Sequence, residues 1–196
     1  MRIALNLKGL EYESRSYRLR DGEQRAADYL QLNPAGLVPT LEIDGHALTQ
    51  SLAIIEYLDS RIAEPRLIPA DPGERARIMS LALTIACDIH PLNNLRVLGY
   101  LERLLGQDKA AVDAWYGHWV TLGFETIETL LGEYPDRPFA AGDSPGLAEI
   151  FLVPQVYNAR RYKVPLAPYP RLTAMADRAA ALPAFAKSAE GMPDVH

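Results

Sequence analysis

The sequence predicts two joined domains, an α/β domain followed by a domain made only of helices. Three observations support this fold class. Short strand-like runs alternate with helical runs up to about residue 62, which is typical of an α/β domain. A proline-rich stretch then covers 64–73. Hydrophobic residues recur at helical spacing after that stretch, without a clear strand. We therefore expect domains at 1–63 and 74–196, joined by a linker at 64–73.

The first domain is expected to begin with a helix over 2–10 that ends at Gly9, because glycine commonly terminates helices. Partial alternation of polar and apolar residues predicts a strand from Tyr12 to Leu19. A helix over Gln24–Leu32 should follow and stop before Asn33-Pro34, since the residue before a proline disfavours helical angles.

A β-hairpin and one more helix complete the predicted first domain. The hairpin joins 40–43 to 46–48 across Asp44-Gly45, a strong two-residue turn signal. The helix covers Ser51–Ile62. These helices and short strands together fit a thioredoxin-like α/β domain.

The second domain reads as helical throughout. Trp115, Trp119, Leu122 and Ile127 lie near helical spacing and are expected to be core residues. Glu149 can bond back to the amide of Gly146 and cap a buried helix. The helices are expected at 75–105 with a break near His90-Pro91, 109–131, 147–161, 171–181 and after Pro183.

Composition excludes several function classes. Of 196 residues, 48% are hydrophobic and 23% charged, which is typical of soluble globular proteins. The net charge of −5 argues against nucleic acid as the main partner. No apolar run approaches a membrane span, and Asn6 and Lys8 interrupt the only apolar stretch near the start, so we expect neither a membrane anchor nor a signal peptide. Cys87 is the single cysteine; it fits a reducing cytosol, and its apolar neighbours predict a buried, inert side chain.

The most informative stretch joins a loop to a helix start. Pro39 has no amide hydrogen, so the backbone around Val38-Pro39 can pair with a peptide-like ligand instead of its own sheet. The same bond is a candidate for the cis form. Gln50 and Ser51 precede an apolar helical run, and a helix N-terminus is a ready site for a carboxylate. The two features together indicate a small anionic peptide as ligand.

These segments resemble the glutathione-binding half of the glutathione transferases, most closely the zeta class of maleylacetoacetate and maleylpyruvate isomerases. Matching segments run in the same order from the first residues to near the last. They are Arg2–Gly9, Asn33–Leu41, Gln50–Leu58, Asp88–Asn94, Leu152–Arg161 and Pro168–Pro170.

The resemblance implies a set of glutathione contacts in the first domain. Gln50 and Ser51 resemble the pair that holds the γ-glutamyl end, and Val38, beside Pro39, resembles the residue whose backbone pairs with the cysteinyl part. Gln24 stands where a polar side chain reaches the tripeptide. The structural alternatives are a simple N-cap at Ser51 and an ordinary exposed helix residue at Gln24.

The second domain supplies the remaining site residues that the resemblance implies. His90 and Asn94 are four residues apart on one expected helix face and are assigned to the ligand. Arg161 resembles an arginine used against a substrate carboxylate, with Arg96 for a second carboxylate. A solvated basic face is the alternative for Arg161. The other histidines, His46, His118 and His196, form no metal-ligand spacing with His90, so no metal is expected.

The chain departs from the family pattern at its start. Family members begin with a strand and a Ser-rich motif that stabilises the glutathione thiolate, whereas this chain begins inside the helix that follows, so no catalytic residue is assigned. Two explanations stay open: a start assigned at an internal GTG codon, or a short chain that completes its sheet by swapping or dimer contact. In either case we expect this polypeptide to lack thiol activation.

The resemblance implies a glutathione-dependent cis–trans isomerase of a maleyl dicarboxylate in aromatic amino acid catabolism, cytoplasmic and homodimeric. Glutathione sulfur would add to the cis double bond, and rotation followed by elimination would give the trans product. Two alternatives stay open: a general transferase acting on small halogenated acids, and a non-catalytic binding protein of the same shape.

Overall fold

The computed structural model describes residues 1–133 and 135–190, a range that leaves His196 outside it. The chain divides into two compact units, Met1–Leu67 and Ile68–His196. The division falls inside the stretch 64–73 that the sequence suggests as a linker.

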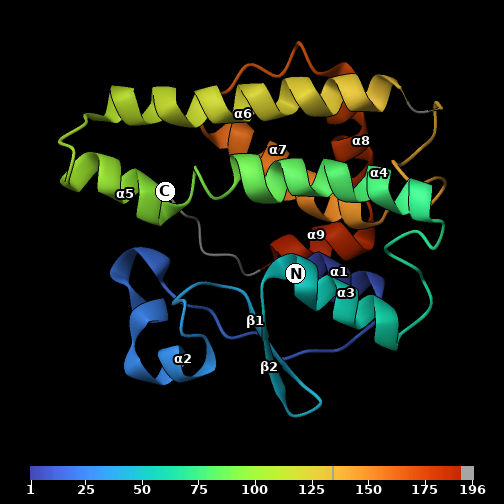
Figure 1. Ribbon diagram of the computed structural model, residues 1–196, viewed down its shortest axis with the longest axis horizontal. Coiled ribbons are helices and arrows are strands. Elements are labelled where there is room, and N and C mark those ends of the chain that lie inside the picture. The colour runs from blue at the N-terminus through green and yellow to red at the C-terminus, as the bar shows by residue number, and fades with distance from the viewer. Residues whose placement is uncertain (134, 191–196) are drawn as a thin grey trace. The chain divides into compact units, whose positions relative to one another are not determined.

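The first unit contains helices and a single hairpin (Figure 1). Its elements are α1 Arg2–Leu7, 3₁₀ turns at Leu19–Asp21 and Glu23–Arg25, α2 Ala27–Leu32, β1 Thr40–Ile43, β2 His46–Thr49 and α3 Ser51–Arg61. Gly9 follows the end of α1 with a φ of 66°, which confirms the predicted helix end.

The hairpin forms as its turn signal predicts. β1 pairs antiparallel with β2 in the register Thr40 opposite Thr49 and Ile43 opposite His46. Both turn residues have positive φ, 51° at Asp44 and 76° at Gly45, as a type I′ turn requires. The Tyr57 hydroxyl of α3 donates to Asp44 Oδ2 over 2.8 Å and fixes the turn to the helix.

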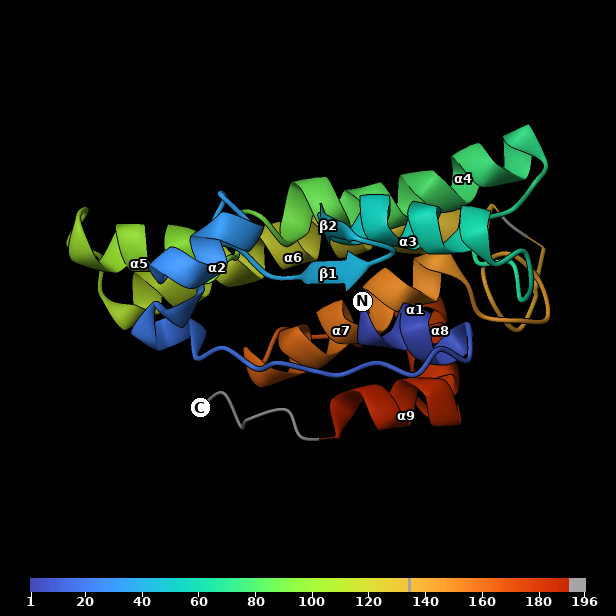
Figure 2. The same cartoon turned by 90° about the horizontal axis from the view of Figure 1, so that it is seen from below.

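Two predicted elements of this unit are wrong or altered. The stretch Tyr12–Leu19 is not a strand; it runs as a plain coil into a 3₁₀ turn (Figure 2). A strand needs a paired backbone, and β1 and β2 are the only named strands among the described residues, paired with each other. The predicted helix over Gln24–Leu32 is broken at Ala26, whose ψ of 151° is extended, and α2 starts one residue later.

A buried lysine ties the ends of this unit together. The ammonium of Lys8, fully shielded from solvent, donates to Asp59 Oδ1 at 2.7 Å, to the Ile62 carbonyl at 2.6 Å and to the Pro65 carbonyl at 2.7 Å. Asp59 Oδ1 also accepts from the Leu67 amide at 2.7 Å. All three lysine protons therefore have acceptors, which is the condition for burying a charge.

The second unit is a helical bundle, as the periodicity predicts (Figure 1). Its elements are α4 Pro72–Leu83, a π-helical stretch Thr84–Ile89, α5 Leu95–Arg103, α6 Lys109–Gly132, α7 Leu147–Arg161, α8 Pro170–Ala180 and α9 Pro183–Ala189. α7 packs against α4 and α8, and α6 packs against α8 and the π-helical stretch.

The predicted break near His90-Pro91 is present, with a π-helical stretch in front of it. The His90 amide donates to the Ile85 carbonyl at 2.8 Å, one residue further back than in an α-helix. Gly123 of α6 allows this stretch to pack closely, because a Cβ there would lie 2.3 Å from Cδ1 of Ile89.

The buried face of α6 differs from the predicted one. Ile127 is buried as expected, but Leu122 is 44% exposed and both tryptophans are half-buried. The helix instead buries a neighbouring stripe, made of Val112, Tyr116, Val120, Gly123, Phe124, Ile127 and Leu131. Aromatic and leucine positions alone gave the right period with the wrong phase, because the small residue Gly123 marks the contact face.

A buried carboxylate caps α7 as predicted. Glu149 Oε2 accepts from the Gly146 amide and its Oε1 from the Ala140 amide, both at 2.8 Å, and the residue has no exposed surface. Burial raises the pKa of Glu149, while these backbone amides act in the opposite direction. The carboxylate thus joins the helix start to the preceding loop.

The cysteine of the second unit lies at the surface, contrary to the prediction. Cys87 is exposed, so the prediction of a buried thiol is wrong. Its side chain lies on the outer side of the π-helical stretch, whereas Ile85 and Ile89 of the same stretch are buried.

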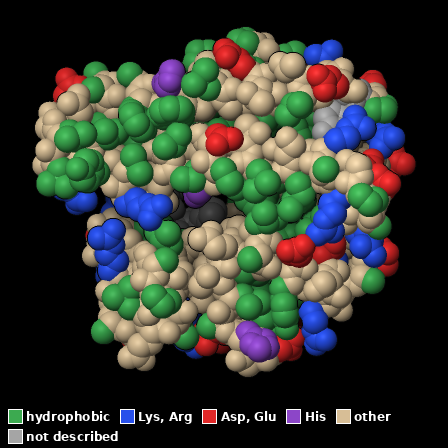
Figure 3. Space-filling model, viewed as in Figure 1, with side chains coloured by type: hydrophobic (Ala, Val, Ile, Leu, Met, Phe, Trp, Pro, Cys, Tyr) green, Lys and Arg blue, Asp and Glu red, His purple; other side chains and the backbone are tan. Residues whose placement is uncertain are grey.

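Apolar side chains also gather over α5 (Figure 3), where Tyr100, Leu104 and Leu105 are 53%, 71% and 54% exposed. Within the described residues, no helix is long and apolar enough to cross a membrane.

Candidate functional site

The loop before β1 presents a free stretch of backbone. Val38-Pro39 is cis, as proposed from the sequence, and the Val38 side chain is 44% exposed. The Leu37 carbonyl before it accepts from Tyr29 Oη at 2.7 Å and from Asn33 Nδ2 at 2.6 Å, which fixes the loop. Among described residues, neither the amide nor the carbonyl of Val38 has a hydrogen-bond partner. Both groups are available to an extended peptide.

The start of α3 presents open amides next to a strained residue. Ser51 is the first helical residue and Gln50 precedes it, so the alternative of Ser51 as a simple N-cap is wrong. The first helical bond runs from the Ile54 amide to the Gln50 carbonyl, and no side chain caps the helix. Gln50 has φ 68° and ψ 118°, a region that non-glycine residues rarely adopt and that often marks a ligand site.

Gln24 is not the exposed helix residue that the structural alternative assumed. It lies in a 3₁₀ turn, and its Nε2 donates to the Leu19 carbonyl at 3.2 Å. Its Oε1 is shielded from solvent and, among the described residues, has no hydrogen-bond partner. A shielded acceptor without a donor is costly, so a ligand amide would be a favourable partner.

In the second unit, His90 and Asn94 flank a turn instead of sharing one helix face. His90 ends the π-helical stretch, and Asn94 is the N-cap of α5, where its Oδ1 accepts from the Arg96 amide at 3.1 Å. The four-residue spacing argument is therefore wrong, because no continuous helix joins the two positions. Desolvation lowers the pKa of His90 from 6.5, which favours the neutral imidazole at pH 7.

The basic cluster at the end of α7 separates into distinct environments. Arg160 Nη2 bonds both carboxylate oxygens of Asp177 on α8, at 2.8 Å and 3.0 Å. Arg161 instead places its Cζ 5.9 Å from the ring centroid of Tyr157, one turn earlier on the same helix. Arg160, Arg161 and Lys163 are all exposed, so the solvated basic face stays an open alternative for Arg161. Arg96 is exposed at the first turn of α5.

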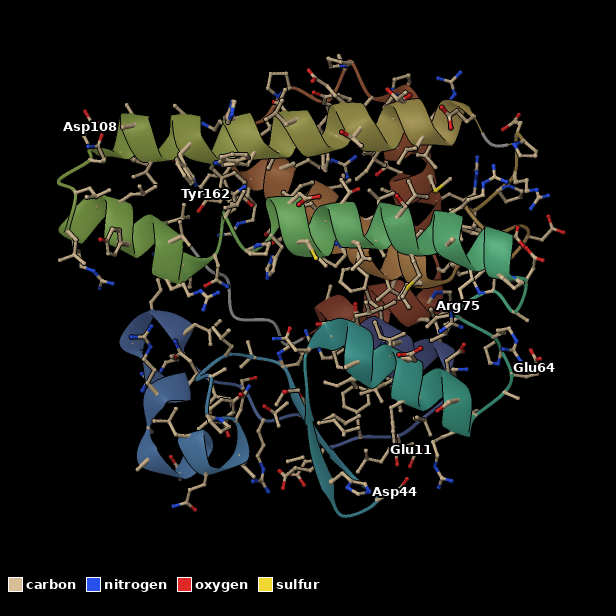
Figure 4. The ribbon with its side chains drawn as sticks, in the orientation of Figure 1. Glu11, Asp44, Glu64, Arg75, Asp108 and Tyr162 are labelled. Atoms are coloured by element: carbon tan, nitrogen blue, oxygen red, sulfur yellow. The ribbon has the colours of Figure 1, made fainter. Side chains whose placement is uncertain are left out.

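A stack of two tyrosine rings supports the chain directly after Arg161, at the end of α7. Tyr162, which is labelled in Figure 4, follows the end of α7. Its ring stacks on that of Tyr116 of α6 with centroids 3.6 Å apart and an interplanar angle of 5°. Burial raises the pKa of Tyr116 to about 12, while a hydrogen bond with Gln155 and the charge of Arg161 act in the opposite direction. The phenol is therefore neutral at physiological pH.

Several supporting residues were not predicted from the sequence. Tyr29 and Asn33 hold the loop, and Tyr157 lies beside Arg161. The four-residue step from Tyr157 to Arg161 is a signal that could have revealed the last pair. The stack between Tyr116 and Tyr162 joins residues far apart in sequence, and no local pattern reveals it. No group of histidine, cysteine, aspartate or glutamate that could hold a metal occurs within the part of the chain that the structure describes.

Comparisons with known proteins give the family. The family model "Glutathione S-transferase, N-terminal domain" matches residues 1–61, and "Glutathione S-transferase, C-terminal domain" matches residues 111–178. The maleylacetoacetate isomerase of Pseudomonas aeruginosa is 50% identical over 188 residues, covering 94% of this chain and 87% of that protein. The maleylpyruvate isomerase of a Ralstonia species is 45% identical over 190 residues, covering 96% of this chain and 90% of that protein.

Solved structures agree with these matches. A holo structure of maleyl pyruvate isomerase, a bacterial zeta-class glutathione S-transferase, has a TM-score of 0.95 at 45% identity and covers 98% of this chain and 92% of its own. A maleylacetoacetate isomerase from Anaeromyxobacter dehalogenans with bound glutathione has a TM-score of 0.86 at 38% identity. This match covers 100% of this chain and 91% of the other. The chain therefore belongs to the glutathione transferase family, among the zeta-class maleylacetoacetate and maleylpyruvate isomerases.

Proposed function

We propose that this protein is a glutathione-dependent cis–trans isomerase of a maleyl dicarboxylate, either maleylacetoacetate or maleylpyruvate. Near full-length identity of 45–50% to isomerases of both substrates supports the reaction class. The structural observation that most directly supports glutathione as cofactor is the Val38 backbone, which has both its amide and its carbonyl open among the described residues.

The first unit offers groups that match glutathione. Val38, beside Pro39, would pair with the backbone of the cysteinyl part as an added strand does. The open amides at the start of α3, with Gln50 and Ser51, suit the γ-glutamyl carboxylate and ammonium. Gln24 Oε1 would accept from an amide of the tripeptide. His90 and Asn94 stay predicted glutathione contacts.

The second unit offers cations for the substrate. A guanidinium binds a carboxylate through two parallel hydrogen bonds, so Arg161 and Arg96 would each take one carboxylate of the dianion. Glutathione supplies the thiol that adds to and then leaves the cis double bond, which permits rotation between the two steps. The arginines hold the carboxylates while charge develops next to one of them, and this stabilises the transition state.

Glutathione-dependent isomerisation of maleylpyruvate, followed by loss of the enol absorbance, tests the reaction. Turnover that requires glutathione is expected when the chain is preceded by the first strand and Ser-rich motif of the family. Arg161→Ala should raise KM for maleylpyruvate at least about tenfold, the cost of one charged hydrogen-bond pair, and leave KM for glutathione nearly unchanged. An equal rise in both constants would mean that Arg161 serves folding.

If the chain with that motif folds and still turns over neither maleyl substrate, the isomerase proposal is contradicted. Turnover of a chlorinated acid would then favour the general transferase, and glutathione binding alone would favour a binding protein. We further propose a cytoplasmic homodimer on the basis of the family resemblance. Sedimentation should give about twice the chain mass of 21.7 kDa, and a monomer at micromolar concentration would contradict the dimer.

A further inference from the structure

We propose that Trp115 and Asn93 are positioning residues, which attach the turn at 90–94 to α6 and thereby orient the side chains used for glutathione. The inference rests on the proposed function, in which His90 and Asn94 contact glutathione. Both contacts belong to this turn: His90 follows the π-helical stretch, and Asn94 is the N-cap of α5. The conformation of the turn therefore decides where the two side chains point.

The backbone hydrogen bonds of the turn itself are long. Pro91 has no amide hydrogen, so the helical pattern cannot continue through it unbroken. The Asn94 amide donates to the Pro91 carbonyl at 3.4 Å. The Asn93 amide donates to the Ile89 carbonyl at 3.2 Å. Both distances lie at or beyond the usual upper limit, so the backbone alone holds the turn weakly.

Two side-chain hydrogen bonds join the turn to α6. Trp115 Nε1 donates to the Leu92 carbonyl at 2.9 Å. In the opposite sense, Asn93 Nδ2 donates to the Tyr116 carbonyl at 3.2 Å. Neighbouring residues of the turn thus meet neighbouring residues of α6, and two points of attachment restrict both the position and the rotation of the turn.

The surroundings of Asn93 favour a positioning role over a stabilising one. Asn93 is 9% exposed, and its Oδ1 is shielded from solvent without a hydrogen-bond partner among the described residues. A buried acceptor without a donor costs at least as much free energy as one hydrogen bond contributes, so Asn93 adds little net stability. An apolar residue would avoid that cost, but it could not bond to the Tyr116 carbonyl.

Trp119 provides a matched comparison on the same helix. It lies one helical turn after Trp115, and the two indole rings meet edge to face with centroids 5.5 Å apart. The Trp119 Nε1 is shielded from solvent and, within the part of the chain that the structure describes, has no hydrogen-bond partner. The two tryptophans are both half-buried and differ in the bond to the Leu92 carbonyl.

The test measures the glutathione affinity of the full chain by calorimetric titration, with circular dichroism to verify folding. Trp115→Phe keeps an aromatic ring but loses the N–H donor, and should weaken glutathione binding about three- to tenfold, the effect of one hydrogen bond. Asn93→Leu should weaken binding to a similar extent and change the melting temperature by less than about 4 °C. Trp119→Phe, which removes the same atoms from the other ring, should leave the affinity unchanged.

Two further measurements separate positioning from a general loss of structure. The NMR resonance of the Leu92 carbonyl carbon should move in Trp115→Phe and stay in place in Trp119→Phe, because only the first variant loses a hydrogen bond to that oxygen. In a chain that carries His90→Ala and Asn94→Ser, Trp115→Phe should have no further effect on glutathione affinity, since it acts only through the two contacts. Asn94→Ser retains an N-cap residue for α5.

Each result gives a decision. If the chain with His90→Ala and Asn94→Ser binds glutathione as tightly as the original, the assignment of both contacts under the proposed function fails, and the inference fails with it. If that chain binds more weakly but Trp115→Phe and Asn93→Leu do not, the contacts keep their role and the positioning inference alone is wrong. Equal weakening in Trp115→Phe and Trp119→Phe, or an undiminished effect of Trp115→Phe without the two contacts, would also overturn the inference.

Discussion

Single residues in this protein gain their roles from what surrounds them. Glu149 and Lys8 both have ionisable side chains and are both buried, yet each meets enough hydrogen-bond partners to stay in the interior. Cys87 shows the opposite case, an apolar neighbourhood in sequence with an exposed position in the fold. Local sequence therefore identifies a residue's chemistry better than its burial.

Replacing Glu149 by alanine should destabilise the protein by about 2–3 kcal/mol at pH 4, because two buried amides lose their acceptor. Burial raises the pKa of Glu149, so the folded protein holds the proton more tightly than the unfolded chain. The stabilisation from this residue is complete below the ordinary pKa of 4.5 and decreases as pH rises through the raised value. The difference between the two proteins should therefore shrink from pH 4 towards pH 7.

Urea unfolding of both proteins at several pH values measures this difference. Glu125→Ala, an exposed change on α6, should alter the unfolding free energy by less than about 0.5 kcal/mol at any of them. A difference for Glu149→Ala that grows between pH 4 and pH 7 would mean that the carboxylate has a lowered pKa.

At the scale of helices and strands, the predicted elements are present where the local sequence signal does not depend on a distant partner. The turn residues Asp44-Gly45 and the helix-breaking pair His90-Pro91 fixed their own surroundings, so sequence sufficed for the hairpin and for the break. The predicted strand Tyr12–Leu19 failed because a strand depends on a partner that its own residues do not encode. The same reason explains the site: Val38 and Ser51 are local features, whereas the support of Arg161 by Tyr116 and Tyr162 arises only when helices pack.

The strained backbone of Gln50, at the start of α3, is expected to lower the stability of the protein while its side chain serves glutathione binding. Gln50→Gly should raise the unfolding free energy by about 1 kcal/mol, since glycine accepts a φ of 68° and ψ of 118° without strain. It should also weaken glutathione binding about tenfold, because the amide side chain is lost.

Calorimetric titration with glutathione and thermal unfolding measure the two effects. Gln31→Gly in α2, outside the proposed site, should destabilise the protein by about 1 kcal/mol and leave glutathione affinity unchanged. Unchanged affinity in Gln50→Gly would remove Gln50 from the proposed site.

At the scale of the whole molecule, the two compact units are stabilised in different ways. The helical unit has an apolar core made by the buried faces of α4, α6, α7 and α8. The first unit, with one two-stranded hairpin among its described residues, depends more on the buried hydrogen bonds of Lys8. A small apolar core leaves little reserve, so single polar contacts carry a larger share of its stability.

Lys8→Met should therefore lower the unfolding free energy by about 3 kcal/mol, because Asp59 stays buried without its cation. Urea unfolding followed by circular dichroism measures the loss. Lys187→Met, an exposed change on α9, should cost less than about 0.5 kcal/mol. Equal stability of the two variants would show that the buried lysine contributes nothing net.

The π-helical stretch before His90 makes the number of residues in this region as important as their identity. It fits six residues, Thr84–Ile89, into turns wider than those of an α-helix. Inserting one more codon there, with the added residue taken up as ordinary α-helix, would rotate the chain that follows by roughly 100° about the axis. His90 would then face another direction with its own sequence untouched, so natural insertions should be rare between Thr84 and Pro91.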